Sequence, residues 1–332
     1  MRILALVDYE AIPTDDPAIE GRTEEIRASM ECHVLGALRK LGHEVTVLPF
    51  GPDVTKTIDE LTLAKPELVF NMTERFEGDR RKDLNIAALL ELLHLPYTGT
   101  GPSGLALCRD KATCKRVLGY HRIRVPRFAL LPPGKTFLPR SFLFPMIVKP
   151  VYEDGSDGIS LASIVRATPE LEERVRMIHE RMKQPAICEE YIEGREIYIG
   201  IVGNGRLQSF PPRELHFGKD ADAPQIATAR VKWDDAYREK WGIKYVDSEL
   251  PEALGPHLAK LSKRIFQLLQ MNGYGRIDLR VTAQGEAAFL EANPNPDLSR
   301  DADLASAAAR AGMDYETLID RIVSLAVKRN AM

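Results

Sequence analysis

The chain has 332 residues, a length that predicts about two hydrophobic cores or one large α/β domain and excludes a peptide. Hydrophobic residues make up 44% and charged residues 28%, which excludes collagen-like, low-complexity and coiled-coil classes. With 45 Lys and Arg against 48 Asp and Glu, the formal charge is −3, so the chain lacks the basic excess of a nucleic-acid-binding domain. Any site for a polyanion must therefore be local.

The cysteines and the apolar runs indicate the expected compartment. Cys32, Cys108, Cys114 and Cys188 form no C-x-x-C pair, so we interpret them as buried small hydrophobic residues. No apolar run approaches the ~18 residues of a membrane span, and Asp8 interrupts the first apolar run before a signal-peptide core could form. We expect a reducing, cytoplasmic location, with no membrane and no nucleic acid as partner.

The first hundred residues alternate short apolar runs with helical patterns, which is typical of βαβ units. Strands are predicted at 3–7, 45–48 and 68–70, and helices near 23–41 and 82–94. In the first helix, apolar residues recur every three or four positions, which predicts one apolar stripe packed against a parallel sheet, and Gly42 ends the helix. The acidic stretch 9–21 is long for a strand-to-helix connection, so it is either a functional loop or a mobile insertion.

Turn-forming residues at 95–102 predict the end of an amino-terminal α/β substrate domain at 101. A second unit, 102–188, has a predicted helix at 103–120, a strand at 146–149, a glycine-containing loop, a strand from Ile159, a helix at 169–183 and a strand ending at Glu189. A third unit, 189–332, has predicted strands at 196–202, 277–281 and 287–290 and two helices after Asp301. We find no internal repeat.

The strongest local motif is a predicted hairpin that carries Arg276, Asp278, Glu291 and Asn293. Asp278 lies in one strand and Glu291 ends the next, so both carboxylates and the Asn293 carbonyl should reach neighbouring positions. Such hard oxygen ligands suit Mg²⁺ shared with nucleotide phosphates. Arg276 shares a strand face with Asp278, where a guanidinium can stabilise an oxyanion. The alternative is a surface hairpin with an ordinary ion pair.

A second motif is a lysine, Lys149, at the end of an apolar strand, followed by the loop Gly155-Ser156-Asp157-Gly158. Small residues let backbone N–H groups approach phosphates, and the lysine adds a point charge. This is not a P-loop, because the chain has no G-x-x-x-x-G-K-[ST]. The alternative is a plain glycine-rich turn with a lysine that reaches solvent.

A third motif, residues 187–196, links two apolar strands with acidic residues. Its backbone could bind an adenine edge and Glu196, seven residues beyond Glu189, could bind ribose hydroxyls, although a solvated hairpin would read the same. Lys111 lies in a helical stretch, where most lysines face water.

In this order, Lys111, Lys149 with its glycine loop, Glu189-x6-Glu196, Arg276-x-Asp278 and Glu291-x-Asn293 resemble the ATP-grasp superfamily, and within it the D-alanine–D-alanine ligase branch. The stretch Glu25-x3-Ser29 looks like the amino-terminal substrate motif of that branch. The stretches 69–71 and 95–99 are similar to its segment before the ATP-binding lobes. The resemblance covers nearly the whole chain.

The resemblance implies an ATP-grasp fold, α/β and α+β, in which an amino-terminal parallel-sheet domain precedes two lobes that clamp ATP. It implies a ligase that joins a small-molecule carboxylate to an amine, such as an amino acid or short peptide, through an acyl phosphate. It also suggests a homodimer. The resemblance assigns the contacts with ATP phosphates to Lys111, Lys149 and Lys232. It assigns the contacts with adenine to Glu189 and the backbone of Glu190, Tyr191 and Ile192, and those with ribose to Glu196.

The same resemblance assigns two Mg²⁺ ions, for which Mn²⁺ can substitute, to Asp278, Glu291 and Asn293. Three catalytic roles follow from it as well. Arg276 would stabilise the tetrahedral oxyanion, Glu25 would bind the ammonium group of the first substrate, and Ser156 would orient that substrate.

The chain departs from this branch at three places. The loop reads Gly155-Ser156-Asp157-Gly158 where the branch has Gly-Ser-Ser-x-Gly. Lys232 is followed by Trp233 where the branch has tyrosine, and Asp297 replaces the glycine of a Pro-Gly pair near the carboxylate of the second substrate. Asp297 adds negative charge and removes close backbone approach, so a free D-alanine carboxylate is repelled unless Arg300 compensates. We therefore predict a different substrate pair. The alternatives are an authentic D-alanine–D-alanine ligase, a non-catalytic ATP-binding regulatory protein, and a phosphotransferase that forms no amide.

Overall fold

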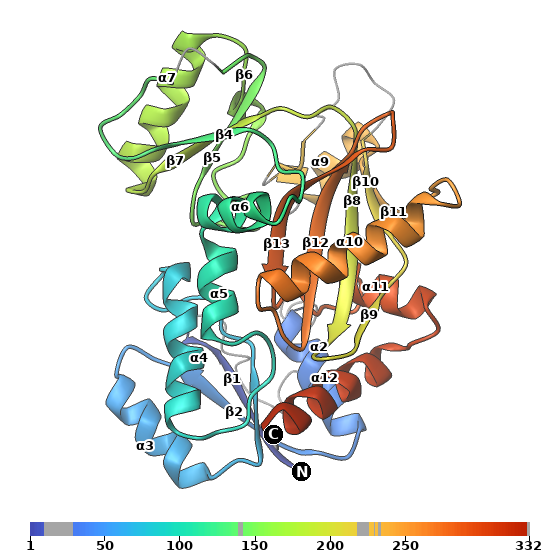
Figure 1. Cartoon of the computed structure of the whole chain (residues 1–332). Coiled ribbons are helices and arrows are strands. Elements are labelled where there is room, and N and C mark those ends of the chain that lie inside the picture. The colour runs from blue at the N-terminus through green and yellow to red at the C-terminus, as the bar shows by residue number, and fades with distance from the viewer. Residues whose placement is uncertain (10–28, 139–141, 218–225, 229, 232–233, 331–332) are drawn as a thin grey trace.

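The computed structural model describes residues 1–9, 29–138, 142–217, 226–228, 230–231 and 234–330. These residues form three sheets (Figure 1): a parallel sheet at the amino-terminal end, a small antiparallel sheet at the opposite end, and a large antiparallel sheet beside both. The predicted mixture of one α/β part and two α+β parts is confirmed. No helix within the described ranges is long and apolar enough to cross a membrane.

The parallel sheet has the order β2-β1-β3, built from β1 (Arg2–Asp8), β2 (Glu44–Phe50) and β3 (Leu68–Asn71). This confirms the three predicted strands. Helices α2 (Met30–Lys40) and α3 (Val54–Ala64) connect them. The Ser29 hydroxyl caps α2 by accepting a hydrogen bond from the Cys32 amide, and Gly42, at φ +82°, follows the last turn as predicted. The part of this helix predicted at 23–28 lies outside the described residues.

The parallel sheet is apolar on both faces. One face packs against α3 and α4 (Asp83–Leu92), which is preceded by the short η3 (Arg80–Lys82). The other face packs against α2 and two helices from the far end of the chain, α11 (Asp303–Arg310) and α12 (Tyr315–Asn330). The last helices thus complete the core of the first sheet. The domain boundaries at 101 and 188 stay a prediction, and a strand runs through position 188.

The single helix predicted at 103–120 is wrong: the structure has two, α5 (Pro102–Arg109) and α6 (Lys111–Tyr120). Asp110 between them is extended. Its carboxylate accepts hydrogen bonds from the Ala112 and Thr113 amides, both at 2.9 Å. A side chain that caps a new helix competes with continuation of the old one. As a result Lys111 is the first residue of α6.

The small sheet has the order β4-β7-β5-β6 and comprises β4 (Phe128–Leu131), β5 (Met146–Pro150), β6 (Ile164–Val165) and β7 (Ala186–Glu190). Helix α7 (Thr168–Met177), extended by the π turn η5 (Ile178–Met182), covers one face. The strand predicted from Ile159 is wrong, because β6 begins only at Ile164. The 3₁₀ turn η4 (Leu161–Ser163) lies before it, closed by a 3.0 Å bond from the Ser160 amide to the Ser163 hydroxyl.

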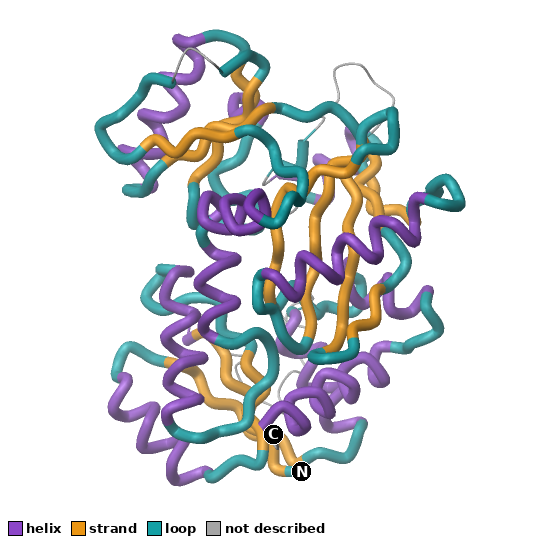
Figure 2. The backbone as a smooth tube through the Cα atoms, viewed as in Figure 1, coloured by secondary structure: helices purple, strands orange, loops and turns teal. Residues whose placement is uncertain are grey.

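The large sheet has the order β11-β10-β8-β12-β13, with β9 paired to β8. Its long strands run side by side as the larger group of orange segments in Figure 2. Its strands are β8 (Arg195–Gly203), β9 (Leu207–Ser209), β10 (Arg213–His216), β11 (Lys244–Asp247), β12 (Tyr274–Val281) and β13 (Ala287–Pro294). Helix α10 (Leu254–Leu268) covers its apolar face, and α9 (Asp235–Trp241) lies near β11. Because strand side chains alternate, the other face of β8 and β12 receives the charged residues.

Candidate functional site

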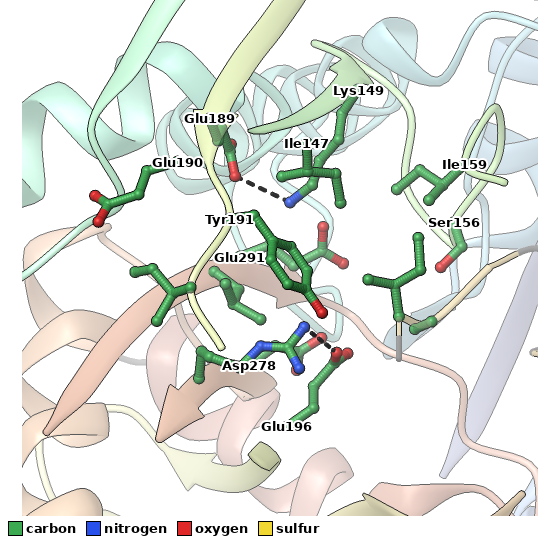
Figure 3. A pocket seen from close by; sticks show the side chains of 15 residues that line it. Ile147, Lys149, Ser156, Ile159, Glu189, Glu190, Tyr191, Glu196, Asp278 and Glu291 are labelled. Carbon is green, nitrogen blue, oxygen red and sulfur yellow. Dashed lines mark hydrogen bonds and ion pairs between the residues drawn. The ribbon is translucent and has the colours of Figure 1, made fainter. Parts of the chain in front are cut away.

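A pocket lies between the small sheet and the large sheet (Figure 3), lined by residues of β5, β7, β8, β12, β13 and the glycine loop. Most residues that the sequence singled out meet there. The predicted residues that line it are Lys149, Ser156, Glu189, Glu190, Tyr191, Ile192, Glu196, Asp278 and Glu291. Residues up to 142 positions apart in the chain therefore share one pocket.

The wall from the small sheet carries a buried carboxylate between two ammonium groups. Glu189 Oε2 lies 3.0 Å from Lys149 Nζ, and Oε1 lies 3.1 Å from Lys115 Nζ. Burial raises the pKa of Glu189, but the two lysines outweigh it and lower this pKa to about 2. Burial likewise disfavours charged Lys149, yet the Glu189 carboxylate raises its pKa. Glu189 is therefore ionised, and two lysines flank its single carboxylate.

Lys115 was missed by the sequence prediction. Its spacing from Lys111 was the available signal, because residues four apart lie on one face of a helix. Its ammonium also donates to the Leu290 carbonyl and lies 5.3 Å from the centre of the Phe289 ring. Leu290 has no partner on β12 where the pairing register shifts after Asp278, so the lysine satisfies a carbonyl at this bulge.

Lys111 is buried, so the water-facing alternative is wrong. Its ammonium donates to the carbonyl of Glu153, just before the glycine loop, and lies 3.9 Å from the Glu291 carboxylate. Burial lowers its pKa, against the charge of Glu291. Lys111 borders a second depression next to the pocket, together with Asn293 and the shared Glu291. This lysine thus connects the glycine loop to β13.

The glycine loop has an unusual backbone. Gly155, Ser156 and Gly158 all have positive φ, and for Ser156 the value is +66°. A Cβ atom on Gly158 would lie 2.7 Å from the Met182 sulfur, so glycine is required there. Buried Arg109, the last residue of α5, pairs with Asp154, which directly precedes the loop. This ion pair holds the loop against α5. Strained, anchored loops of this kind cluster at functional sites.

The wall from the large sheet holds Glu196 by both carboxylate oxygens. Arg280 Nη2 lies 3.0 Å from Oε2, and the Tyr198 hydroxyl donates to Oε1 at 2.8 Å. Arg280 was not predicted, although it lies two residues after Asp278 and so on the same strand face. The Glu190 side chain points away from the Lys149–Glu189 pair in Figure 3 and accepts from the Arg127 amide at 3.2 Å.

The predicted hairpin brings the proposed metal ligands together. In the β12–β13 register Asp278 faces Glu291 and Arg276 faces Asn293. The Asn293 amide donates to Asp278 Oδ2 at 3.0 Å. Arg276 Nε and Nη2 lie 2.8 and 2.9 Å from the two Asp278 oxygens, a bidentate pair that raises the pKa of Arg276 despite its burial. Arg276 itself lies behind Asp278 and does not line the pocket.

These donors fit a divalent cation that is shared with phosphate. Asp278, Glu291 and Asn293 offer two carboxylates and an amide oxygen, the hard ligands that Mg²⁺ prefers. Among the described residues no three His, Cys, Asp or Glu side chains gather closely enough to hold a metal alone. Mg²⁺ commonly completes its coordination with waters and substrate phosphates. Glu25 and Lys232, predicted for substrate and phosphate, lie outside the described residues, as does most of the 9–21 stretch.

Comparisons with known proteins agree with this arrangement. Residues 135–324 match the family model described as D-ala D-ala ligase C-terminus. A D-alanine–D-alanine ligase of Aquifex aeolicus is 29% identical over 92% of this chain and 97% of its own length, and one of Cupriavidus metallidurans is 30% identical over 88% and 85%. A Sinorhizobium fredii relative, "Uncharacterized protein y4sG", is 31% identical over 89% and 87%.

Solved structures show the same fold. The D-alanine–D-alanine ligase of Bacillus anthracis complexed with ATP superposes with a TM-score of 0.76 at 20% identity, covering 100% of this chain and 99% of that one. The enzyme of Coxiella burnetii gives a TM-score of 0.69 at 18% identity, over 99% and 95%. The chain therefore belongs to the D-alanine–D-alanine ligase family, whose members are ATP-grasp enzymes that form carbon–nitrogen bonds and release ADP and phosphate.

Proposed function

We propose that this chain joins a carboxylate to an amine through an acyl phosphate, and that its substrates are not two molecules of D-alanine. The observation that carries the reaction type is the pairing of Arg276 with Asp278 directly beside Glu291 and Asn293, next to a pocket with a buried lysine, Lys149. Nucleotide binding alone does not require that arginine, which supports an enzyme over a non-catalytic ATP-binding protein.

The residues divide the work between binding and transfer. Lys111 and Lys149 would bind ATP phosphates, while Glu189 and the 190–192 backbone would bind adenine and Glu196 the ribose. Asp278, Glu291 and Asn293 would hold Mg²⁺, which when bound neutralises charge on the phosphoryl group. The substrate carboxylate attacks the γ-phosphorus and ADP leaves. The amine then attacks the acyl carbon and loses a proton, and phosphate leaves to give the amide, while Arg276 stabilises the oxyanion.

The loop after the metal motif supports a different substrate pair. Asp297 accepts hydrogen bonds from the amide and the hydroxyl of Ser299, at 2.8 and 2.7 Å. Arg300, the residue that could offset its charge, pairs with Glu316 at 2.6 Å and lies over the Tyr315 ring. Arg300 therefore pairs with Glu316 and does not cancel the negative charge of Asp297. This disfavours an acceptor that presents a carboxylate there.

Trapping of the acyl phosphate tests the proposal. Hydroxylamine replaces the amine and converts an acyl phosphate to a hydroxamate, so the first half-reaction can be measured before the acceptor is known. The protein is incubated with ATP, Mg²⁺ and a panel of D- and L-amino acids, hydroxy acids and dipeptides, and ADP, phosphate and products are measured. We expect a hydroxamate with at least one donor, and loss of ~100-fold or more in Glu291→Gln.

The matched control is Glu286→Gln, which removes a carboxylate from the exposed turn of the same hairpin, where Glu286 pairs with Arg124. It should keep the wild-type rate within about twofold. Robust D-alanine-dependent formation of D-alanyl-D-alanine would show an authentic D-alanine–D-alanine ligase instead. ATP binding without product for any donor would favour the non-catalytic protein, and a stable phosphate ester would favour a phosphotransferase.

A further inference from the structure

Asp303, the first residue of α11, faces the arginine that the proposed function assigns to the oxyanion. Its Oδ2 lies 3.6 Å from Arg276 Nη1, and its Oδ1 lies 3.8 Å from Arg213 Nε. The Asp303 side chain is 11% exposed, and those of Arg276 and Arg213 are 14% and 15% exposed. One carboxylate from the carboxy-terminal helices therefore lies between two nearly buried guanidinium groups.

The remaining groups of these arginines also have partners within the chain. Arg276 uses Nε and Nη2 for Asp278, and its guanidinium carbon lies 4.7 Å from the centre of the Tyr198 ring. Arg213 Nη1 donates to Asp247 at 2.7 Å. A third arginine, Arg310, lies 3.4 Å from the same Asp247.

Positive and negative charges are equal in this cluster. Its members are Arg213, Arg276, Arg310, Asp247, Asp278 and Asp303. Three guanidinium groups thus meet three carboxylates. Each guanidinium group of the cluster therefore already lies beside a carboxylate of the chain, with which a substrate carboxylate would compete.

The position of the cluster gives this balance a consequence. If Arg276 stabilises the oxyanion, the attacking amine must approach the acyl carbon beside it, and a carboxylate on the next atom of the acceptor would lie only a few ångströms away. A carboxylate there meets arginines that Asp303 and Asp278 already neutralise. A substrate carboxylate would have to share these guanidinium groups with Asp303 and would be repelled by it, which is a means of rejecting the wrong partner.

We propose that Asp303 determines acceptor specificity and that the acceptor is an amine without a carboxylate next to its amino group, such as a simple amine or an amino acid blocked as its amide. This inference deepens the proposed function and rests on it. Asp303 acts on the acceptor through the arginines, so it is a specificity residue and takes no part in phosphoryl transfer.

The test begins with the hydroxamate assay, which identifies a donor without any acceptor. With that donor, amide formation is then compared for matched acceptors: alanine, alaninamide and ethylamine, in both configurations where they exist. We expect kcat/KM for alaninamide or ethylamine to exceed that for alanine by about tenfold or more. In Asp303→Asn, which removes the charge at nearly constant volume, this ratio should fall by about tenfold.

The control is Glu286→Gln, which removes an exposed carboxylate outside the cluster, on the β12–β13 turn, where it pairs with Arg124. It should leave the acceptor ratio within about twofold. A wild-type protein that prefers alanine over alaninamide overturns the inference even if the Asp303 variant does not fold. An unchanged ratio in a folded Asp303→Asn overturns it as well. If no donor gives a hydroxamate, the proposed function itself fails, and the inference fails with it.

Discussion

The two walls of the pocket are built in the same way but carry opposite charges. In β5 of the small sheet, Met146 and Val148 pack under α7, and Lys149 points to the other face. In β12 of the large sheet, Ile277 and Leu279 pack under α10. The charged residues that alternate with them, Arg276, Asp278 and Arg280, lie on the other face. Both strands alternate with period two. Only the residues on the second face differ.

That difference sets the sign of each wall. On the small-sheet side, Lys149 and Lys115 flank Glu189, and Glu190 points away from this pair, so positive charge is in excess around Glu189. On the large-sheet side, three carboxylates, Glu196, Asp278 and Glu291, line the pocket together with one arginine, Arg280, so negative charge is in excess. A ligand that joins a polyphosphate to a divalent cation matches both walls at once. The alternation of the strands thus determines where the charged side chains lie. The numbers of basic and acidic side chains determine which ligand groups each wall can bind.

The first prediction concerns Arg276, the arginine that pairs with Asp278 of the large-sheet wall. Arg276→Met leaves Asp278 and Asp303 without their shared partner and removes the oxyanion contact. We expect kcat for hydroxamate formation to fall by about 10² to 10³, with a change in the KM for ATP of only a few fold. Steady-state kinetics measure both.

The control for Arg276→Met is Arg264→Met, which removes an arginine from α10 that donates to the His121 carbonyl far from the pocket. Its kcat should stay within about twofold of wild type. A loss of less than tenfold in Arg276→Met would contradict the catalytic role.

The second prediction concerns Lys115, one of the two lysines that flank Glu189. Lys115→Met keeps the length of the side chain but leaves Glu189 with one lysine, in a cluster where the Lys115 and Glu189 side chains are fully buried. Breaking a buried ion pair from one side typically destabilises by about 3–5 kcal/mol, so we expect the free energy of unfolding to fall by about that amount. Urea denaturation measures it.

Lys135→Met serves as the control, because Lys135 is an exposed lysine of the same lobe. It should change the free energy of unfolding by less than about 0.5 kcal/mol. If Lys115→Met unfolds at the same urea concentration as this control, the buried cluster contributes no stability.

The third prediction concerns how the free energy of unfolding depends on pH through Glu189. The folded-state pKa of Glu189, about 2, lies below its ordinary value of 4.5. Its ionisation therefore stabilises the fold above pH 4.5, and this contribution is lost as the pH falls from there toward 2. The full loss is on the order of 3 kcal/mol. Unfolding free energies of wild type and Glu189→Gln between pH 5 and pH 3 should have different slopes, with the variant less sensitive to acid.

Asp8 provides a control of opposite sign at the end of β1. Burial raises its pKa from 3.8 to about 6, against hydrogen bonds from the Glu74 and Arg75 amides. Its ionisation therefore destabilises the fold as the pH rises from about 4 to 6, and Asp8→Asn should remove that decrease. Parallel pH curves for wild type and Glu189→Gln would contradict the ionised buried cluster.

Local patterns in the sequence predicted most of the fold. The three parallel strands, β5, β8, β12, β13 and the two last helices follow from apolar periodicity, which depends on residues close together in the chain. The helix break at Asp110 was missed because an Asp-Lys pair on an apolar pattern does not by itself show a cap. The start of β6 was missed because two residues of strand carry almost no period.

The site was predictable only in part, and the reason is again distance along the chain. Lys149, Glu189, Asp278 and Glu291 stand at the ends or in the middle of predicted strands, so their meeting could be inferred from motif order. Asp303 could not be found in this way. Its partner Arg213 is 90 positions earlier, on a strand that only tertiary packing brings next to α11.

The return of α11 and α12 to the first sheet has a consequence for synthesis. One face of β1 and β3 packs against residues 298–326, more than 200 positions later in the chain. While the ribosome makes the intervening lobes, α2 can already pack on that face, but the part that α11 and α12 cover stays exposed. The amino-terminal sheet therefore begins first and is completed last, and the nascent chain carries an apolar surface that chaperones can bind until the final helix has left the exit tunnel.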